Sequence, residues 1–417
     1  MQSFWTILRR RLLLFLMVFG PATITAMADN DASGVATYAI GGAKLGYPIL
    51  FALGLITVLL GVTQEMGMRL TLVTRKGLGD LIREQKGVGF ALLFFIGLFI
   101  ANMGTIIVDV AAFKTTAQLL HLPAIPLVII LVLVTFVFVI KGDYKLTQNI
   151  MLLSCLLYFA YIFSAFKANP DWFNAVSNLF VPHGVAVTGT YFKNYLIIGL
   201  GVLGTTITPW GQFFISSFAY DKKIDKAKLK YSQLETYIGA FLTDFFSFFM
   251  IVATAATLFI HNIPLVSGEQ AALAIKPFAG NLAAMLFAVG IMNAGFMGVV
   301  VVSLSTAYAF AEFFGLSGSL DTSFHQSKGF YIIFIVQLVL AAIIAIFPFI
   351  SLFQLAVGSQ VLNAMLLPFI FFYLIKFTNS RDLMGEFTNH NWQKYIAVGG
   401  SVAISIASVA AVIFAVM

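Results

Sequence analysis

The chain has 417 residues, of which 60% are apolar and 10% charged, with a formal net charge of +7 and a mean hydropathy of +0.97. A soluble domain carries about 25% charged residues, so this composition excludes an ordinary soluble protein and predicts one that lies in a lipid bilayer. Apolar runs such as 125–140 are too long for the alternating strands of a membrane barrel, which leaves transmembrane helices. We attribute the positive charge to cytoplasmic loops rather than to nucleic-acid binding.

Eleven apolar segments are each long enough to cross a bilayer, which takes about 20 residues. They lie near 12–41, 47–73, 88–118, 123–140, 146–166, 191–219, 231–260, 278–314, 329–348, 351–376 and 393–416. The first segment follows three arginines, as a signal peptide does, but no small-residue cleavage site comes after it, so we interpret it as a retained helix. The prediction is an all-α membrane protein with a single transmembrane domain over 1–417.

The distribution of basic residues predicts the orientation of the chain. With the N-terminus in the cytoplasm, 19 of the 24 Lys and Arg residues fall on the cytoplasmic side. We therefore expect a multi-pass protein of the cell membrane with a cytoplasmic N-terminus and an extracellular C-terminus. Cys155 is the only cysteine, so no disulfide can form within the chain, and we interpret this residue as a small packing residue.

The first helix contains residues that an uninterrupted membrane helix would avoid. Positions 29–34 read Asp-Asn-Asp-Ala-Ser-Gly between apolar flanks. Carboxylates at membrane depth cost several kcal/mol unless they are paired, and Asn, Asp, Ser and Gly favour turns. The sequence therefore predicts a broken helix that carries a functional site.

The sixth helix is interrupted in a similar way at 204–212, which contains Pro209. Proline lacks a backbone N–H, so it frees a carbonyl upstream, near Thr205, where a cation could bind. The alternative is two unrelated kinks, since Pro and Gly are common in membrane helices.

Breaks in helices 1 and 6 occupy the same position in two halves of five helices. This spacing predicts inverted repeats with a binding site at the middle of the membrane, as in secondary transporters. We place repeat one at about 12–166, repeat two at about 191–376 and an extra helix at about 393–416.

Several short motifs resemble the Nramp divalent-metal transporters. They are Gly20-Pro21-Ala22 leading to Asp31, the turn at 41–47, Thr74-Arg75-Lys76-Gly77-Leu78 after helix 2, Asp109-Val110-Ala111-Ala112-Phe113 in helix 3, Lys230-Tyr231-Ser232 before helix 7 and Ser359-Gln360-Val361 in helix 10. The resemblance covers most of the chain. It implies a LeuT-like inverted repeat of 5+5 helices, with helices 1 and 6 broken and a further break at 359–361.

The site departs from the usual Nramp pattern at several positions. The family has Asp-Pro-Gly-Asn in helix 1, and this chain has Asp31-Ala32-Ser33-Gly34. The family has Met-Pro-His in helix 6, and this chain has Thr208-Pro209-Trp210. This combination most resembles the prokaryotic Nramp-related magnesium transporters.

The chemistry of these positions favours a hard cation. Thr208 replaces a thioether with an oxygen, and all five histidines are predicted in or beside loops. Oxygen ligands suit Mg²⁺, Ca²⁺ and Mn²⁺, and Mg²⁺ keeps several of its waters. We expect the small Gly34 and Thr208 to leave room for them. Mg²⁺, and also Mn²⁺, is therefore the predicted substrate, and no cofactor is expected.

Six residues are predicted to form the metal site, and four others to surround it. The predicted metal ligands are Asp31, Thr205, Thr208, Gln360, Asn30 and Gly34, and the surrounding residues are Asp29, Trp210, Asp244 and Asp109. For several of these residues a structural role is the alternative: Gln360 in a helix–helix hydrogen bond, Asp244 in a structural pair, and Asp109 as a partner of Lys114. We expect Glu65 near the membrane interface.

The groups that the resemblance links to proton movement are depleted here. Trp210 replaces the histidine of helix 6, Ala112 replaces a second acid in helix 3, and the segment 325–328 has no arginine. The prediction is metal uptake without proton coupling, and the alternative is a proton-coupled Mn²⁺/Fe²⁺ transporter of the usual Nramp type.

Two other classes of protein fit the sequence less well. A symporter of organic acids would place its substrate against Asp29 and Asp31, and a membrane sensor would need a soluble output domain. No nucleophile and base can be paired, so an enzyme is not expected, and no catalytic residue is assigned. The lipid bilayer and the metal ion are the expected partners, with no obligate protein partner evident.

Overall fold

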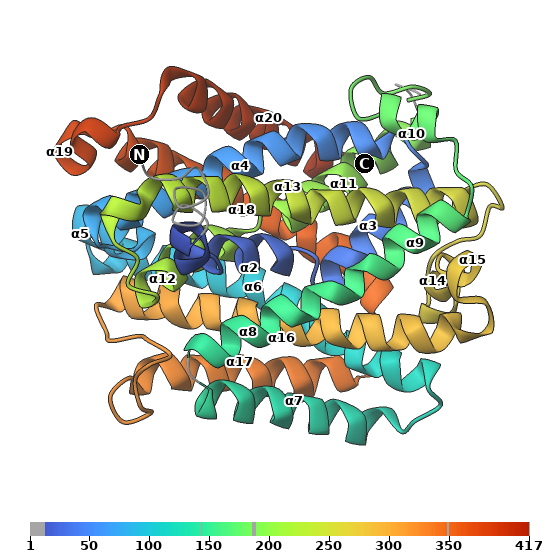
Figure 1. Cartoon of the computed structure of the whole chain (residues 1–417), viewed down its shortest axis with the longest axis horizontal. Coiled ribbons are helices and arrows are strands. Elements are labelled where there is room, and N and C mark those ends of the chain that lie inside the picture. Colours follow the sequence, from blue (N-terminus) through green and yellow to red (C-terminus); the bar gives the residue numbers. More distant parts are fainter. Residues whose placement is uncertain (1–12, 143, 186–188, 348–349, 417) are drawn as a thin grey trace, which may run out of the picture.

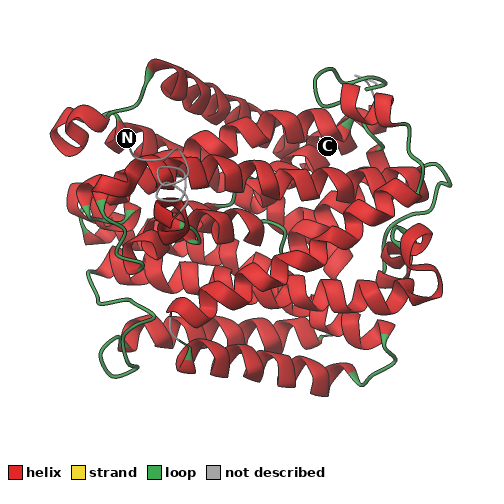
Figure 2. Cartoon of the chain, in the orientation of Figure 1, coloured by secondary structure: helices red, strands yellow, loops and turns green. Residues whose placement is uncertain are grey.

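The computed structural model describes residues 13–142, 144–185, 189–347 and 350–416. Every regular element in these ranges is a helix (Figure 2). An all-helical membrane protein is therefore confirmed. Physically, a chain in lipid must satisfy its backbone hydrogen bonds within each segment, and the helix does so.

Ten helices or helix pairs in the described residues are long and apolar enough to cross a membrane. The long elements are α4 (Ile49–Thr74), α6 (Val88–Leu119), α7 (Ala124–Lys141), α8 (Tyr144–Ser154) with α9 (Phe159–Lys167), α11 (Gly189–Thr206) with α12 (Pro209–Asp221), α13 (Leu229–Thr254), α16 (Ala283–Phe314), α17 (Lys328–Ile346), α18 (Leu352–Thr378) and α20 (Asn391–Val416). The eleventh predicted crossing is the pair α2 (Pro21–Ala28) and α3 (Ala32–Leu45), whose halves are each too short to count alone.

The broken pair α2–α3 lies in the middle of the bundle. Figure 1 shows the two halves end to end between α13 on one side and α6 and α16 on the other. The second broken pair, α11–α12, packs on α3, α4, α16 and α18. Helices α7 and α17 lie at one edge of this view and α20 at the opposite edge (Figure 1). The two interrupted helices are thus shielded by uninterrupted ones.

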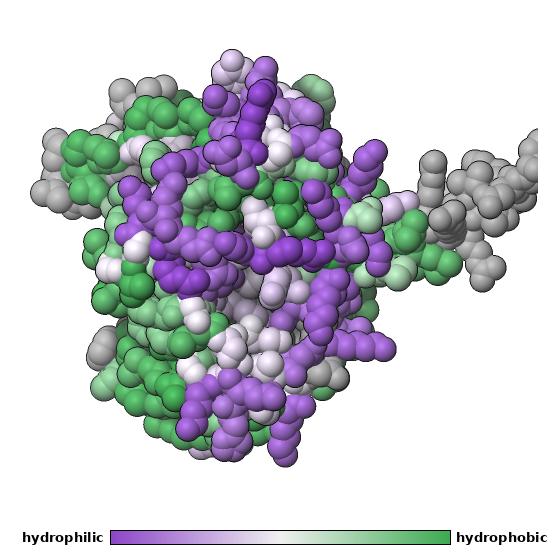
Figure 3. Space-filling view, turned by 90° about the vertical axis from the view of Figure 1, so that its left-hand side faces the viewer, coloured by the Kyte–Doolittle hydropathy of each residue, from purple (hydrophilic) through white to green (hydrophobic). Residues whose placement is uncertain are grey.

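Short helices cover both ends of the bundle. They are α5 (Leu78–Lys86), α10 (Trp172–Ser177), α14 (Gly268–Leu273), α15 (Lys276–Ala279) and α19 (Arg381–Met384). The end that carries α5, α12 and α19 is rich in hydrophilic side chains, and apolar surface flanks it (Figure 3). This end holds the lysines of 222–230 and Arg75, Lys76 and Arg83, so it is the end predicted to face the cytoplasm.

The predicted break in helix 10 is wrong. Helix α18 runs without interruption through Ser359-Gln360-Val361. The hydroxyl of Ser359 donates to the carbonyl of Ala356 at 2.9 Å, so the serine is satisfied inside the helix. The only proline of α18 is Pro368, two turns further along.

Glu65, which we expect near the membrane interface, forms an ion pair inside the bundle. Its side chain is fully buried, and its carboxylate pairs with Arg69 one turn later, with Arg69 Nε to Glu65 Oε1 at 2.7 Å. The four-residue spacing of Glu65 and Arg69 shows that the two side chains can pair along one face of a helix, but their burial depends on the helices that cover that face.

Candidate metal-binding centre

The break in the first helix consists of Asp29, Asn30 and Asp31, between the end of α2 and the start of α3. Asp31 is the N-cap of α3: its Oδ1 accepts hydrogen bonds from Gly34 N at 2.7 Å and Ser33 Oγ at 2.9 Å. A carboxylate is stabilised there because the first N–H groups of a helix have no partner within it and carry partial positive charge. The local sequence therefore holds Asp31 at a half-helix terminus inside the bundle.

The break in the sixth helix is short. It leaves Ile207 and Thr208 outside α11 and α12. Thr208 is the N-cap of α12, and its Oγ1 accepts from Gly211 N at 3.0 Å. Pro209 occupies the first helical position, where a missing N–H costs nothing. The carbonyl of Thr205 consequently has no N–H partner four residues later.

The two breaks touch each other. Thr208 Oγ1 donates to Asp29 Oδ1 at 3.4 Å, and Thr205 Oγ1 donates to the Asp29 carbonyl at 3.5 Å. A Cβ added to Gly34 would lie 2.2 Å from the Asp29 carbonyl and 2.9 Å from Thr205 Oγ1. Glycine is thus required at 34 for the close approach of the breaks. The expected room for waters beside Gly34 is wrong, because backbone and hydroxyl atoms fill it.

Helix α6 adds a third carboxylate to this region. Asp109 Oδ1 accepts from Ser33 N at 3.1 Å, whereas its buried Oδ2 has no hydrogen-bond partner among the described residues. A Cβ added to Gly298 of α16 would lie 2.1 Å from Asp109 Oδ2 and 2.7 Å from Asp31 Cβ. Asp31 and Asp109 therefore pack against the same glycine, in a space that only a residue without a side chain leaves open.

The alternative role of Asp109 as a partner of Lys114 is wrong. The ammonium of Lys114 donates to the carbonyls of Phe347 and Ile350 at 2.8 and 2.9 Å. Five residues along a helix turn through about 140° beyond a full circle, so the two side chains leave α6 in different directions. Asp109 faces the broken helix instead.

Gln360 links α18 to this region through Ser33. Its Nε2 donates to Ser33 Oγ, and its Oε1 accepts from Asn363 Nδ2 at 2.7 Å. Asn363 Nδ2 also donates to Thr105 Oγ1 of α6 at 2.9 Å. The alternative of a helix–helix hydrogen bond thus describes the observed contacts of Gln360. The sequence interpretation missed Ser33, although its place two residues after an N-cap carboxylate was a usable signal.

Asn30 faces away from the other break. Its Nδ2 donates to Thr243 Oγ1 at 2.8 Å and its Oδ1 accepts from Ser247 Oγ at 2.9 Å, both on α13. Its carbonyl accepts from Tyr158 at 2.7 Å. These contacts attach the first break to α13 and to the short helix η1 (Cys155–Tyr158), which precedes α9. They favour a structural role for Asn30 over its predicted role as a metal ligand.

Asp244 and Trp210, both predicted to surround the site, are buried near it. Neither carboxylate oxygen of Asp244 has a hydrogen-bond partner among the described residues, and this side chain borders a groove with Thr57 and Phe245. The carbonyl of Trp210 accepts from Ser305 Oγ at 2.7 Å, while its indole N–H has no partner in the described part of the chain. The tryptophan therefore fills space behind the second break.

Imidazole ligands are missing from the described part of this centre. All five histidines lie in turns or loops, as predicted: His121, His183, His261, His325 and His390. Within the described ranges, no three His, Cys, Asp or Glu side chains are grouped closely enough to hold a metal by themselves. A cation here would need carboxylates together with carbonyl, hydroxyl or water oxygens, which are the ligands of hard ions.

A family model described as natural resistance-associated macrophage protein-like matches residues 22–414. The chain belongs to the Nramp family. The divalent metal cation transporter MntH of Levilactobacillus brevis is 26% identical over 396 residues, covering 90% of this chain and 84% of the relative. MntH of Staphylococcus aureus is 26% identical over 415 residues, covering 95% and 90%. The resemblance stated from the motifs is thereby confirmed at the level of the family.

Solved structures share the fold of this Nramp chain. The manganese transporter of Eremococcus coleocola, in complex with an aromatic bis-isothiourea compound, matches with a TM-score of 0.78 at 20% identity, covering 98% of this chain and 87% of that one. MhsT in complex with L-phenylalanine matches with a TM-score of 0.62 at 13% identity, covering 97% and 98%. The LeuT-like architecture is therefore confirmed, and the resemblance to the magnesium-transporting branch stays a prediction.

Proposed function

We propose that this Nramp chain carries a divalent metal cation across the membrane and binds it between the two broken helices, with Asp31 as the central ligand. The observation that carries the proposal is the meeting of both breaks at buried carboxylates. Asp29 and Asp109 each keep one oxygen without a hydrogen-bond partner in the described residues. A buried anion is costly unless a cation or proton compensates it, and a divalent ion supplies that charge.

Ion binding to the half-helices would change the conformation of the protein. The N-termini of α3 and α12 begin at Asp31 and Thr208, and Thr205 offers a carbonyl from the end of α11. A cation bound to ligands from both breaks interacts only with conformations that hold them together. It therefore shifts the population toward the closed site, which is how a substrate drives alternating access.

For the ion itself we propose hard divalent cations, with Mg²⁺ accepted together with Mn²⁺. The names of the relatives, divalent metal and manganese transporters, support Mn²⁺ more directly than Mg²⁺. Mg²⁺ is supported by the ligand chemistry alone: Thr208 presents a hydroxyl where the family has a thioether, and Trp210 stands where it has an imidazole.

We further propose that the divalent ion is taken up without proton coupling. The membrane potential alone would supply about 2.3 kcal/mol per charge per 100 mV, and roughly twice that for a divalent ion. The second candidate is a proton-coupled Mn²⁺ transporter. One observation favours it: the buried Oδ2 of Asp109, which has no hydrogen-bond partner in the described part of the chain, lies beside Asp31, where it could hold a proton.

The test is uptake by proteoliposomes that contain only this protein, with Mg²⁺, Mn²⁺, Ca²⁺ and Cd²⁺ offered singly and in competition. We expect saturable uptake of Mn²⁺ and Mg²⁺ that compete for one site, with weaker Cd²⁺ uptake. Mn²⁺ uptake that excess Mg²⁺ does not inhibit would remove the magnesium part and leave the manganese transporter. No uptake of any divalent ion in correctly folded protein would overturn the proposal.

A further inference from the structure

A polar pocket of 330 Å³ opens at the end of the molecule that is predicted to be cytoplasmic. Basic side chains from three elements line it: Arg69 of α4, Lys226 of η2 (Lys226–Lys228), and Lys230 of α13. His390 and Gln393, at the start of α20, complete this side. The pocket is therefore built where α4, α13 and α20 meet.

The charges in this pocket are only partly balanced within the described part of the chain. Arg69 is neutralised by Glu65, but neither Lys226 nor Lys230 has an ion pair among the described residues. The ammonium of Lys226 lies 4.2 Å from the centre of the Phe387 ring, a cation–π contact within the lining. Among the described residues of the lining Glu386 is the single acid, so these residues carry net positive charge and suit an anion.

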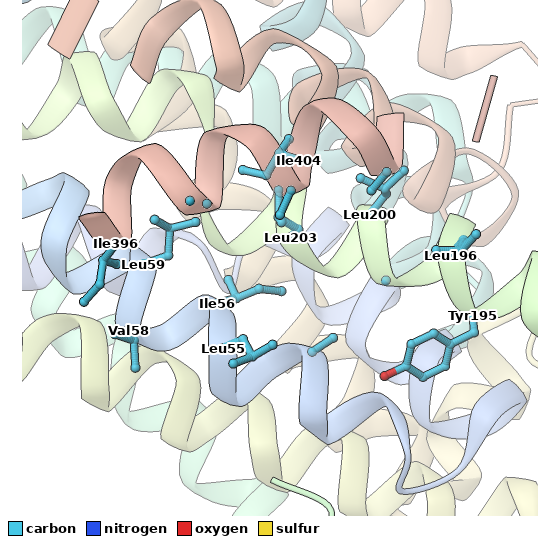
Figure 4. A pocket seen from close by; sticks show the side chains of 16 residues that line it. Leu55, Ile56, Val58, Leu59, Tyr195, Leu196, Leu200, Leu203, Ile396 and Ile404 are labelled. Carbon is cyan, nitrogen blue, oxygen red and sulfur yellow. The ribbon is translucent and has the colours of Figure 1, made fainter. Parts of the chain in front are cut away.

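An apolar groove of 480 Å³ lies further along the same helices. Leu55, Ile56 and Leu59 of α4 form one wall, and Leu200 and Leu203 of α11 another (Figure 4). The third wall comes from α20, where the small residues 399, 400, 403 and 407 leave the space open. Its lining is almost entirely aliphatic, and Leu55 and Val58 in it are exposed at the surface of the bundle, so it suits a hydrocarbon chain.

The pocket and the groove lie one after the other along α4 and α20, and we call this stretch of the two helices the path. Gln393 Nε2 donates to Glu65 Oε2 at 2.8 Å, and a Cβ added to Gly400 would lie 2.6 Å from Leu59. The two helices thus run side by side in opposite directions over this stretch. Arg69 and Leu59 are ten residues apart, about 15 Å along α4, which is about half of the hydrocarbon thickness of a bilayer.

We infer that this path is a binding site for one acidic phospholipid, with its phosphate in the basic pocket and an acyl chain in the groove. Basic pockets between transmembrane helices on the cytoplasmic side are typical sites for acidic headgroups. The apolar groove explains why a lipid, rather than a free phosphate, would be retained. The site is separate from the metal centre, and α11, which forms part of the groove, ends at the second break.

Native mass spectrometry of the detergent-purified protein tests the headgroup part, with dioleoyl phosphatidylglycerol and dioleoyl phosphatidylcholine as probes. We expect tighter binding of phosphatidylglycerol. The double variant Lys226→Ala/Lys230→Ala should lose about ten- to thirty-fold in affinity for it, since each basic residue near a membrane surface contributes about 1 kcal/mol. The control Lys228→Ala/Lys394→Ala removes the same charge from the same end but outside the pocket, and should keep the preference.

Two further arms separate the sources of the phosphate. Ala403→Phe should fill the groove and weaken phosphatidylglycerol binding, whereas Val402→Phe, on the neighbouring lipid-facing surface, should not. Inorganic phosphate in millimolar excess should leave the bound lipid in place. Equal loss in both double variants, no effect of Ala403→Phe, or displacement by inorganic phosphate would each overturn the lipid site. Metal uptake is not part of this measurement, so its outcome is independent of the proposed transport.

Discussion

Two groups of buried charges in this molecule are built in opposite ways. In the network around Glu65, both carboxylate oxygens have partners: Oε1 accepts from Arg69 and Gln233 at 2.7 Å each, and Oε2 from Arg69 at 3.0 Å and Gln393 at 2.8 Å. In the proposed metal-binding centre, Asp29 and Asp109 each keep one buried oxygen without a partner among the described residues.

This difference in hydrogen bonding assigns the Glu65 network a structural role and the open carboxylates the proposed transport role. Buried ion pairs that are fully hydrogen-bonded hold elements together, and the Glu65 network joins α4, α13 and the start of α20. Buried carboxylates with open oxygens cost stability in the absence of a cation, and such groups in a membrane mark ion pathways. Substitutions in the two groups should therefore give opposite phenotypes.

The largest expected effect is on transport, in Asp31→Ala. Removing the central carboxylate should abolish saturable uptake of Mn²⁺ and Mg²⁺, a loss greater than the roughly 10–100-fold that outer residues of metal sites contribute. The measurement is initial uptake in proteoliposomes together with thermal unfolding in detergent, which should change little. Asp382→Ala removes an exposed acid from α19 and is the matched control. Transport close to normal in Asp31→Ala would show that another group binds the ion.

Glu65→Ala should do the reverse and cost stability. It leaves Arg69 buried without its carboxylate, which typically costs about 3–5 kcal/mol. We expect a lower unfolding temperature and poorer expression, with unchanged ion selectivity in the protein that folds. Adding Arg69→Met should recover part of the loss, because the unpaired charge is then gone. A stable Glu65→Ala variant with altered metal selectivity would show that the Glu65 network takes part in transport and is not merely structural.

Gly34→Ala tests the close approach of the two breaks. The new methyl group would meet the Asp29 carbonyl of its own break at 2.2 Å and Thr205 Oγ1 of the second break at 2.9 Å, so the breaks must move apart and metal uptake should fall by roughly ten-fold or more. Gly358→Ala is the control, because a Cβ there meets nothing within 4 Å. Equal uptake by the two variants would mean that the breaks do not need to touch.

Thr208→Met should change the order of preferred ions. It restores a soft thioether at the start of α12, at the cost of the N-cap hydrogen bond to Gly211. We expect Cd²⁺ and Mn²⁺ to gain on Mg²⁺ by roughly ten-fold, the size of effect usual around metal sites. Calorimetric titration of the three ions measures it, with Ile207→Met as a control that adds a thioether one residue away. An unchanged ranking would leave Thr208 with a packing role.

The smallest expected signal is proton movement. Vesicles loaded with a pH-sensitive dye, held at a negative-inside potential and given external Mn²⁺ or Mg²⁺, should take up metal without acidification. Asp109→Asn should then leave the dye signal unchanged. Metal-dependent acidification that disappears in Asp109→Asn would establish the proton-coupled alternative and assign the open oxygen of Asp109 to a proton.

The sequence alone was sufficient for the class of protein and for the places where its helices break. In lipid, the backbone hydrogen bonds of long apolar runs are satisfied by forming helices. Asp, Ser, Gly and Pro within such runs favour helix caps and turns through local hydrogen bonds and backbone geometry. Asp31 and Thr208 are N-caps for those local reasons, so both half-helix starts were predictable. The break expected at 359–361 does not exist: that expectation came from the resemblance, whereas Ser359 is satisfied within an uninterrupted helix.

The partners of each polar residue were decided only by tertiary packing. Asn30 and Asp29 are neighbours in the chain, yet one is tied to α13 and the other touches the second break. Glu65 and Asp109 are both single acids in apolar helices. Glu65 finds Arg69 on its own helix, but the surrounding helices bury that pair, add Gln393 to it, and leave one oxygen of Asp109 open among the described residues. Spacing along a helix fixes which face a side chain leaves from, but its burial and partners depend on segments hundreds of residues away, which no local pattern encodes.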